Sequence, residues 1–300
     1  MRFVAVLNRD GGTLRNADLE ALSARLHEVL ENAGHTLSVE VVTGDQIRAH
    51  LEKAASRRGV DVVLAGGGDG TISTAAGLLM NKKKALAVLP AGTMNLFARG
   101  LGIPLALDAA IEAFATGKVT AVDIATANGR PFVHQFSIGL HAKMVHLREK
   151  MEFGSRLGKI GASTRAAWAA LRRPPRLSVT LRVGEAEMRV RTTGIGVSNN
   201  LFGEGHLPYA DNPAGGVLGI YVASPRKRAE LLRFFYDMMR GRWRDSQHVD
   251  VMQGQTALLK LESPYRRPAV IDGELVRLDP ETRLEIHAGG LNVLVPGKKT

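Results

Sequence analysis

A run of glycines with one aspartate and one threonine follows an apolar stretch in the segment DVVLAGGGDGTISTAAGLL, residues 61–79. Val62 to Ala65 is typical of a buried strand, and Ile72 to Leu79 is typical of the helix that follows it. Glycines let a ligand approach bare backbone amides, and the start of a helix presents free N–H groups with a positive dipole end. This pattern predicts a phosphate-binding loop, because a tight structural turn needs only one or two glycines.

Several side chains could do chemistry next to a bound phosphate. Asp69 could hold Mg²⁺ on a nucleotide or orient an attacking hydroxyl, while Thr71 and Thr93 could donate to phosphate oxygens. The segment VIDGELV places Asp272 and Glu274 two residues apart, which puts both carboxylates on one face if the segment is a strand. Such a pair suits a general base with a metal ligand or helper. The alternative is a hairpin turn, for which Asp-Gly is a common sequence.

Strand and helix signals alternate through the first third of the chain. This order predicts a Rossmann-like parallel sheet with helices on both faces. The loops NRDGGT, GGGDGT and PAGTMN follow the first, third and fourth strands, and ligands bind at the carboxyl ends of strands in such folds. No Walker A sequence and no G-x-G-x-x-G after the first strand occurs. The expected strands are residues 2–8, 36–43, 62–65 and 85–90. The first expected helix begins at residue 19 and ends near Gly34, and the others are residues 47–54, 72–79 and 107–115.

The pattern changes after about Asp123, where strands separated by turn residues dominate. Only two helical stretches interrupt them, residues 146–177 and 226–244. This predicts a second, mainly antiparallel β-sandwich domain. The expected domains are therefore an α/β nucleotide-binding domain over residues 1–123 and a β-rich lipid-substrate domain over residues 124–300, whose last residues could pack back on the first domain.

The two helical stretches account for the whole net charge of +11. Localised positive charge predicts a polyanionic partner. We expect an anionic membrane surface, because Trp168 and Trp243 lie close to arginines, as in a headgroup interface. Nucleic acid is not expected, since the sequence offers no clear stacking platform and no recognised binding motif. The alternative is that both stretches pack an apolar side inward and leave a solvated basic face.

The absence of cysteine excludes disulfides, thiol nucleophiles and Cys-ligated zinc, and fits a reducing compartment. No secretory signal and no apolar run of membrane-spanning length is visible. We therefore expect a cytoplasmic protein that associates peripherally with a membrane.

Five segments occur in one order and resemble the diacylglycerol kinase catalytic-domain family, especially its bacterial lipid kinases. They are GGDGT (67–71), PAGTMNLFAR (90–99), VDIA (122–125), IDGE (271–274) and the closing GGLNVLVP. Sphingosine kinases and, more remotely, NAD kinases share the glycine-aspartate loop. The resemblance implies an α/β nucleotide domain, a β-rich second domain, ATP and Mg²⁺ as cofactors, and transfer of the γ-phosphate to a lipid hydroxyl. A diacylglycerol-like acceptor is expected.

The resemblance also implies roles for individual residues. Asp272 would be the base that takes the acceptor proton, with Glu274 as a support and Asp123 as a relay. Asp211 would be what remains of a metal-binding acidic segment. The residues expected at the nucleotide are Asn8, Gly12, Thr13, Thr43, Gly67, Gly68, Asp69, Gly70, Thr71, Gly92, Thr93 and Asn95.

Ser73, Thr74 and Leu96 depart from the family pattern, which often has x-Asn-Glu after GGDGT and an aspartate after GT-x-N. Two alternatives to a lipid kinase therefore stay open. One is a nucleotide-binding, membrane-associated sensor with little or no turnover. The other is a soluble NAD kinase-like enzyme, against which the DGE motif and the basic stretches argue.

Overall fold

The computed structural model divides the chain into two compact units. The first unit comprises Met1–Ile124, Asn212–Gly215 and His287–Thr300, and the second comprises Ala125–Asp211 and Gly216–Ile286. The structure describes residues 1–149, 174–203, 208–224, 247–262 and 268–297, with residues 165, 169, 230, 233, 236 and 237. Most of the two basic stretches, 146–177 and 226–244, lies outside the described residues. None of the described helices is both long and apolar enough to cross a membrane.

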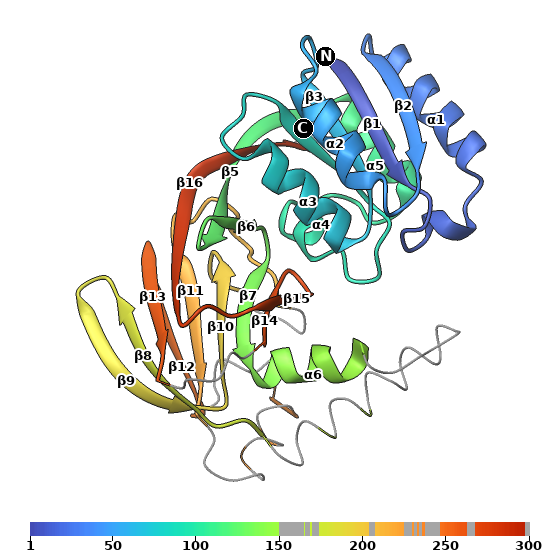
Figure 1. The fold of residues 1–300 in the computed structure, drawn as a ribbon. Coiled ribbons are helices and arrows are strands. Elements are labelled where there is room, and N and C mark those ends of the chain that lie inside the picture. Colours follow the sequence, from blue (N-terminus) through green and yellow to red (C-terminus); the bar gives the residue numbers. More distant parts are fainter. Residues whose placement is uncertain are drawn as a thin grey trace. The chain divides into compact units, whose positions relative to one another are not determined.

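A parallel sheet in the order β2-β1-β3-β4 forms the centre of the first unit (Figure 1). The C-terminal half of β16 joins it, where Asn292 and Val293 pair in parallel with β4. The expected α/β fold with a parallel sheet is confirmed. The strands are β1 Arg2–Asn8, β2 Thr36–Val42, β3 Val62–Gly67 and β4 Ala85–Pro90. The helices are η1 Leu14–Asn16, α1 Leu19–Asn32, α2 Ile47–Ser56, α3 Asp69–Leu79, α4 Leu96–Gly100 and α5 Leu107–Ala115.

Sequence periodicity explains how these elements pack. Every residue of β3 and β4 is buried, as expected for parallel strands covered on both faces. Leu22, Leu26 and Leu30 form the buried face of α1, which packs beside α5, while α2 packs beside α3. Helix α3 begins at Asp69, three residues before the predicted start. Asp69, Gly70 and Thr71 are therefore its first turn, and Gly68 is its extended N-cap.

A six-stranded antiparallel sheet in the order β12-β11-β10-β7-β14-β15 forms one layer of the second unit. A second antiparallel layer contains β9, β8, β13 and the first half of β16. The bounds are β7 Gln135–Gly139, β8 Leu177–Val183, β9 Ala186–Thr192, β10 Gly194–Asn199, β11 Leu218–Ala223, β12 Val249–Gly254, β13 Thr256–Leu261, β14 Pro268–Ile271, β15 Glu274–Arg277 and β16 Glu281–Val295. The predicted antiparallel sandwich is confirmed.

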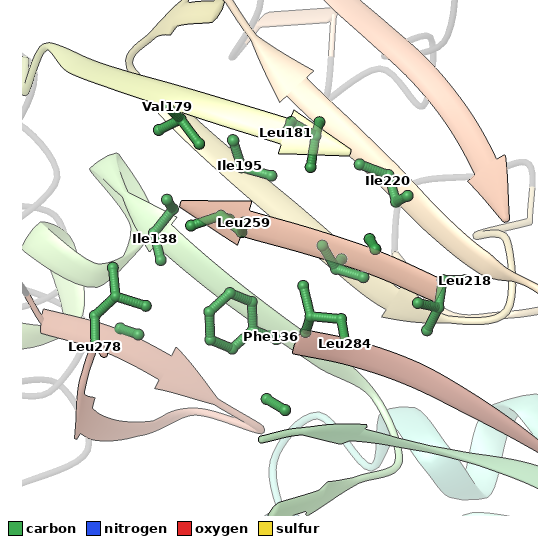
Figure 2. Packing of buried hydrophobic residues seen from close by; sticks show 14 of the residues in the cluster. Phe136, Ile138, Val179, Leu181, Ile195, Leu218, Ile220, Leu259, Leu278 and Leu284 are labelled. Carbon is green, nitrogen blue, oxygen red and sulfur yellow. The ribbon is translucent and has the colours of Figure 1, made fainter. Parts of the chain in front are cut away.

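Alternate residues of both layers meet in one apolar core (Figure 2). Phe136 and Ile138 of β7 belong to the same buried cluster as Leu181 of β8, Leu259 of β13 and Leu284 of β16. This alternation places Ser137 on the opposite face of β7, because side chains along a strand point to opposite faces in turn. Among the described strands, two have residues in both units. They are β16 and β5 Lys118–Ala127, which forms a hairpin with β6 Arg130–Phe132.

Helix α6, Leu140–Glu149, packs on β7, β14 and β15 through a small cluster that includes Ala142, Val145 and Val270. It begins six residues before the predicted basic helical stretch. The change from strand to helix depends on Gly139, whose φ is +81° and whose added Cβ would lie 2.3 Å from the Thr193 carbonyl oxygen. A residue with a side chain would be both strained and obstructed there.

Candidate active site

Three loops follow β1, β3 and β4 at the carboxyl edge of the first sheet, and backbone hydrogen bonds join them. The Thr13 N–H donates to the Ala91 carbonyl at 2.8 Å, and the Ala91 N–H donates to the Gly67 carbonyl at 3.0 Å. The Asn8 side chain links further parts, since its Nδ2 donates to Thr71 Oγ1 at 3.2 Å. These bonds bring Asn8, Thr13, Gly67 and Thr71, all predicted nucleotide contacts, into one cluster.

Backbone packing within this cluster requires glycine at two positions. Gly12 has a φ of +47°, and a Cβ added there would lie 1.8 Å from the Ala91 carbonyl oxygen. A Cβ added to Gly92 would lie 2.9 Å from the Gly68 Cα. In contrast, a Cβ on Gly68 would be 3.6 Å from the Gly92 Cα, an ordinary contact. The fold therefore leaves room for a Cβ at Gly68, so packing does not require glycine at this position.

Asp69 holds the loop after β4 in place. Its Oδ1 accepts the Leu96 N–H at 3.0 Å and its Oδ2 accepts the Asn95 N–H at 3.3 Å, at the start of α4. Asn95, at a φ of +49°, fixes the same loop through Gly92, whose N–H donates to Asn95 Oδ1 at 2.8 Å. The carboxylate predicted as a metal ligand thus has a structural task as well, because it joins the two predicted phosphate loops.

The loop after β2 is attached to the same cluster by a residue that the sequence analysis did not select. Asp10 Oδ2 accepts the Gly44 N–H at 2.8 Å, and the Asp10 N–H donates to Asn8 Oδ1 at 3.1 Å. Thr43 therefore lies one residue from this contact. Its hydroxyl hydrogen-bonds Asp45 and is the main cause of the lowered pKa of that carboxyl group. The one sequence signal for Asp10 is its place in the loop that follows the first strand, two residues after Asn8.

Thr93 and Gly70 are the remaining predicted nucleotide residues. Thr93 is exposed, while Gly70 lies in the first turn of α3, where its carbonyl accepts the Thr74 hydroxyl at 2.9 Å. Thr74, one of the departures from the family pattern, therefore bonds the backbone of its own helix.

Asp123 is a buried acid of the first unit, with 2% of its surface exposed. Its Oδ1 accepts the Gly289 N–H at 2.9 Å, and its own N–H donates to the Pro213 carbonyl at 2.8 Å. These bonds connect the VDIA segment with the closing glycine pair. A role for Asp123 as a proton relay stays a prediction.

The prediction that Asp272 and Glu274 share one face of a strand is wrong, and the hairpin alternative is right. β14 ends at Ile271 and β15 begins at Glu274, and these two residues pair across the hairpin. Asp272 and Gly273 are its two turn residues, with φ values of +46° and +88°. Two successive positive φ values suit the right-handed twist of the flanking strands, which explains why Asp-Gly occurs here.

The Asp272 carboxylate is held by three backbone N–H groups of the segment before β7. Oδ1 accepts from His134 at 3.0 Å and from Gln135 at 2.9 Å, and Oδ2 accepts from Val133 at 2.9 Å. The Asp272 N–H in turn donates to the Gln135 carbonyl at 2.9 Å. Three hydrogen bonds to the carboxylate and one from the Asp272 backbone therefore fix the position of this acid, and the sequence pattern predicted none of these partners.

Glu274 has a different environment. Its side chain is 59% exposed and forms an ion pair with Arg130, with 3.0 Å between Oε2 and Nη2. Asp211, the predicted metal ligand, lies against Gly203, where an added Cβ would be 2.0 Å from its carboxyl carbon. In the part of the chain that the structure describes, no group of three or more His, Cys, Asp or Glu residues could hold a metal ion.

Comparisons with known proteins agree with this architecture. Residues 2–127 match the model of the diacylglycerol kinase catalytic domain, and residues 136–295 match that of the YegS C-terminal NAD kinase beta sandwich-like domain. The chain therefore belongs to the diacylglycerol kinase catalytic-domain family and carries a YegS-type C-terminal domain.

Two curated relatives illustrate the range of similarity. The uncharacterized protein sll0036 of Synechocystis is 25% identical over 276 residues, which cover 86% of this chain and 62% of that protein. A probable lipid kinase YegS-like of Yersinia pestis is 36% identical over 129 residues, 40% of this chain and 43% of that protein. The chain thus spans less than two thirds of the length of the curated relatives it matches.

Solved structures share the fold. A diacylglycerol kinase from Bacillus anthracis str. Sterne is 17% identical with a TM-score of 0.71, covering 98% of this chain and 96% of that one. A second structure from the same organism reaches a TM-score of 0.78 at 21% identity, covering 98% and 95% of the two chains.

Proposed function

We propose that this chain is an ATP-dependent lipid kinase that transfers the γ-phosphate of ATP to the hydroxyl of a diacylglycerol-like lipid. Membership of the diacylglycerol kinase catalytic-domain family supports the reaction class. The observation that carries the proposal is the glycine cluster at the carboxyl edge of the first sheet. There, three loops are fixed to each other while Gly68 keeps a free approach to its backbone.

The nucleotide phosphates would bind at the start of α3. The first N–H groups of any helix lack acceptors within that helix, and they carry the positive end of its dipole. Gly68 and Gly70 have no side chains, so phosphate oxygens can closely approach the backbone N–H groups here. Asn8 and Asn95 hold the surrounding loops, while Thr71 and Thr93 add hydroxyl groups. Because the loops are already hydrogen-bonded to each other, little ordering should be needed on binding.

A divalent cation bound with ATP would neutralise charge on the phosphates. Asp69 is the carboxylate among the loops that fits this role, since each of its oxygens accepts a single backbone N–H in the contacts above and retains acceptor capacity. Leu96 stands where many family members have a further acid, so we expect Asp69 to be the main protein ligand of the cation.

Asp272 is our candidate for the general base that takes the proton of the lipid hydroxyl as the oxygen attacks phosphorus. Its carboxylate is held by backbone groups, which do not move with side-chain rotation, so its position is well defined. A fixed orientation favours proton transfer in the geometry that the reaction needs.

A direct assay tests the function. The purified protein is incubated with γ-labelled ATP, Mg²⁺ and vesicles that contain one lipid at a time, and labelled lipid is separated by chromatography. We expect label in diacylglycerol with the wild type, and much less label with Gly68→Val at the same ATP concentration. ATP binding without label in any lipid would instead favour a nucleotide-binding sensor, the alternative that Leu96 suggests.

We also propose that the basic stretches 146–177 and 226–244 attach the enzyme to anionic membranes, where its substrate resides. The support is their sequence alone: about 1 kcal/mol of attraction per basic residue near such a surface makes several together measurable. The protein should sediment with anionic vesicles, stay in solution with neutral ones, and be released by high salt. Equal sedimentation with both vesicle types would contradict this proposal.

A further inference from the structure

Asn200, directly after β10, has a buried amide group that lacks a hydrogen-bond acceptor among the described residues. The residue is 1% exposed, and its Nδ2 finds no partner there. Its Oδ1 accepts the Val217 N–H at 3.4 Å, which identifies the oxygen and leaves the NH₂ group as the unsatisfied side. A buried donor without an acceptor costs about 1–3 kcal/mol, so its presence calls for a reason.

Asn200 is held in place independently of that amide. Its φ is +65°, a left-handed conformation that asparagine tolerates better than most residues. Its carbonyl oxygen accepts a short hydrogen bond from the Ser198 hydroxyl. The backbone is therefore fixed on both sides of the side chain, and the unsatisfied NH₂ group has a defined position.

This position lies at the end of the six-stranded sheet that carries Asp272. The neighbouring Asn199 N–H donates to the His134 carbonyl at 3.0 Å, and Asn199 Nδ2 donates to the Val133 carbonyl at 3.2 Å. The N–H groups of His134 and Val133 in turn hold the Asp272 carboxylate. Only one short backbone segment therefore separates the residue before Asn200 from the candidate base.

Aromatic rings adjoin this segment. The Phe202 ring stacks on Tyr221 with centroids 5.0 Å apart and 10° between planes, and His134 lies 5.5 Å from Phe202 on a tilted plane. The Phe202 N–H donates to Tyr221 Oη at 2.8 Å, which fixes the stack to the chain beside Asn200. One polar donor among mainly apolar groups is the usual composition of a small-molecule site.

We infer that the Asn200 amide donates a hydrogen bond to an acyl-ester carbonyl oxygen of the lipid acceptor. This inference rests on the proposed function. The NH₂ group of an amide can only donate hydrogen bonds, so its partner must be an acceptor atom. The hydroxyl of a diacylglycerol is committed to the base, and the ester carbonyls are its other strong acceptors. A lipid whose hydroxyl reaches Asp272 would bring an ester group, a few bonds away, to this end of the sheet.

The test compares two lipids and three proteins. Diacylglycerol and the matched dialkylglycerol differ only in that ether linkages replace the esters and remove both carbonyl oxygens. We would measure kcat/KM for each in mixed vesicles with the wild type, Asn200→Gly and Asn200→Asp. Glycine accepts the positive φ without strain and removes the amide, whereas aspartate keeps the acceptor for Val217 and removes the donor. Asn81→Gly, another left-handed asparagine on the exposed surface of the first unit, is the matched control.

We expect the wild type and Asn81→Gly to prefer the ester lipid by about three- to tenfold, as the loss of one hydrogen bond predicts. Both Asn200 variants should lose this preference, with the KM for ATP unchanged. An ester preference that persists in Asn200→Gly would overturn the inference, since something other than the Asn200 amide then recognises the ester. If the wild type phosphorylates neither lipid, nor any other lipid offered, the proposed function is itself wrong and the inference fails with it.

Discussion

The glycine loops of the first unit and the Asp272 hairpin of the second unit hold their polar groups in different ways. In the loops, backbone packs on backbone, as where Gly12 meets the Ala91 carbonyl and Gly92 meets Gly68. In the hairpin, a side chain makes the contacts, because the Asp272 carboxylate accepts hydrogen bonds from three N–H groups of another segment. The loops therefore depend on the absence of side chains, and the hairpin depends on the chemistry of one.

This difference predicts how each region should respond to substitution. Adding side-chain atoms to the loop glycines should impair the loops, because these glycines leave space for a ligand to approach the backbone. Replacing one carboxylate oxygen of Asp272 should impair the hairpin, because its three N–H donors need a carboxylate as acceptor.

Asp272→Asn should have the largest effect. Loss of a general base typically costs about 10²–10⁴ in rate, and we expect kcat for lipid phosphorylation to fall by that range. The amide also turns an acceptor into a donor opposite an N–H group, so the melting temperature should fall as well. Activity is measured well below the melting temperature to separate the two effects.

Asp279→Asn is the matched control for this change, because the Asp279 carboxylate also accepts a hydrogen bond in the second unit, from Asn128 at 2.9 Å. It should retain its rate. If Asp272→Asn turns over at a near wild-type rate, Asp69 becomes the better candidate for the base.

Gly68→Val should weaken ATP binding by about ten- to a hundredfold, the effect of losing one or two hydrogen bonds to charged phosphate. The added methyl groups would occupy the approach to the helix start. Gly68→Ala is the smaller step at the same site, since its Cβ meets only an ordinary contact at 3.6 Å. Isothermal titration calorimetry would measure affinity, and thermal melting would verify the fold. Unchanged affinity in a folded Gly68→Val protein would contradict the loop assignment.

Asp69→Ala and Asp18→Ala compare two carboxylates that each accept two N–H groups at the start of a helix. Asp69 accepts from Asn95 and Leu96, and Asp18 accepts from Glu20 and Ala21 at the start of α1. Both changes should lower the free energy of unfolding by about 1–2 kcal/mol. Only Asp69→Ala should also weaken ATP binding, because only its helix start belongs to the phosphate loops. Equal ATP affinity in the two variants would restrict Asp69 to a capping role.

The smallest effect is expected at Asp61, near the amino end of β3. The Arg2 backbone N–H donates to this carboxylate at 2.8 Å and lowers its pKa from the ordinary value of 3.8. A lowered folded-state pKa contributes stability above the unfolded value, and this contribution is lost as the pH falls through the folded value. Because the side chains of Arg2 and Asp61 are both exposed, we expect the Asp61 carboxylate to contribute at most about a few tenths of a kcal/mol to the free energy of unfolding.

The measurement is the urea midpoint of the wild type and Asp61→Asn at pH 7 and pH 3. The difference between the two proteins should be present at pH 7 and shrink at pH 3, while ATP affinity stays the same. A difference that grows on acidification would show that the ionised carboxylate is not what stabilises this edge.

Much of the fold could be predicted from the sequence, because its signals are local. Helix α5 spans the predicted residues, Leu107–Ala115, since apolar positions at helical spacing identify its buried face. The alternation of strands and turns predicted the sandwich in the same way. Where local signals conflicted, the predicted helix start was less exact. Helix α3 already begins at Asp69, because its first turn accepts Gly70, although glycine is a poor helix former, and Gly68 before it is the extended N-cap.

Local sequence signals predict the two kinds of domain and the glycine loops, and they leave two conformations open at Asp272-Gly273. The folded structure shows which of these conformations occurs and what the acids contact. Asp69 bonds an N–H 27 positions away, Asp272 one 138 positions away, and Asn200 gains its significance from the contact between Asn199 and His134. Spacing along the chain predicts contacts within a helix or a hairpin, where geometry is fixed by a few residues. A hydrogen bond between distant segments depends on how whole sheets pack, because many residues together determine where each partner lies.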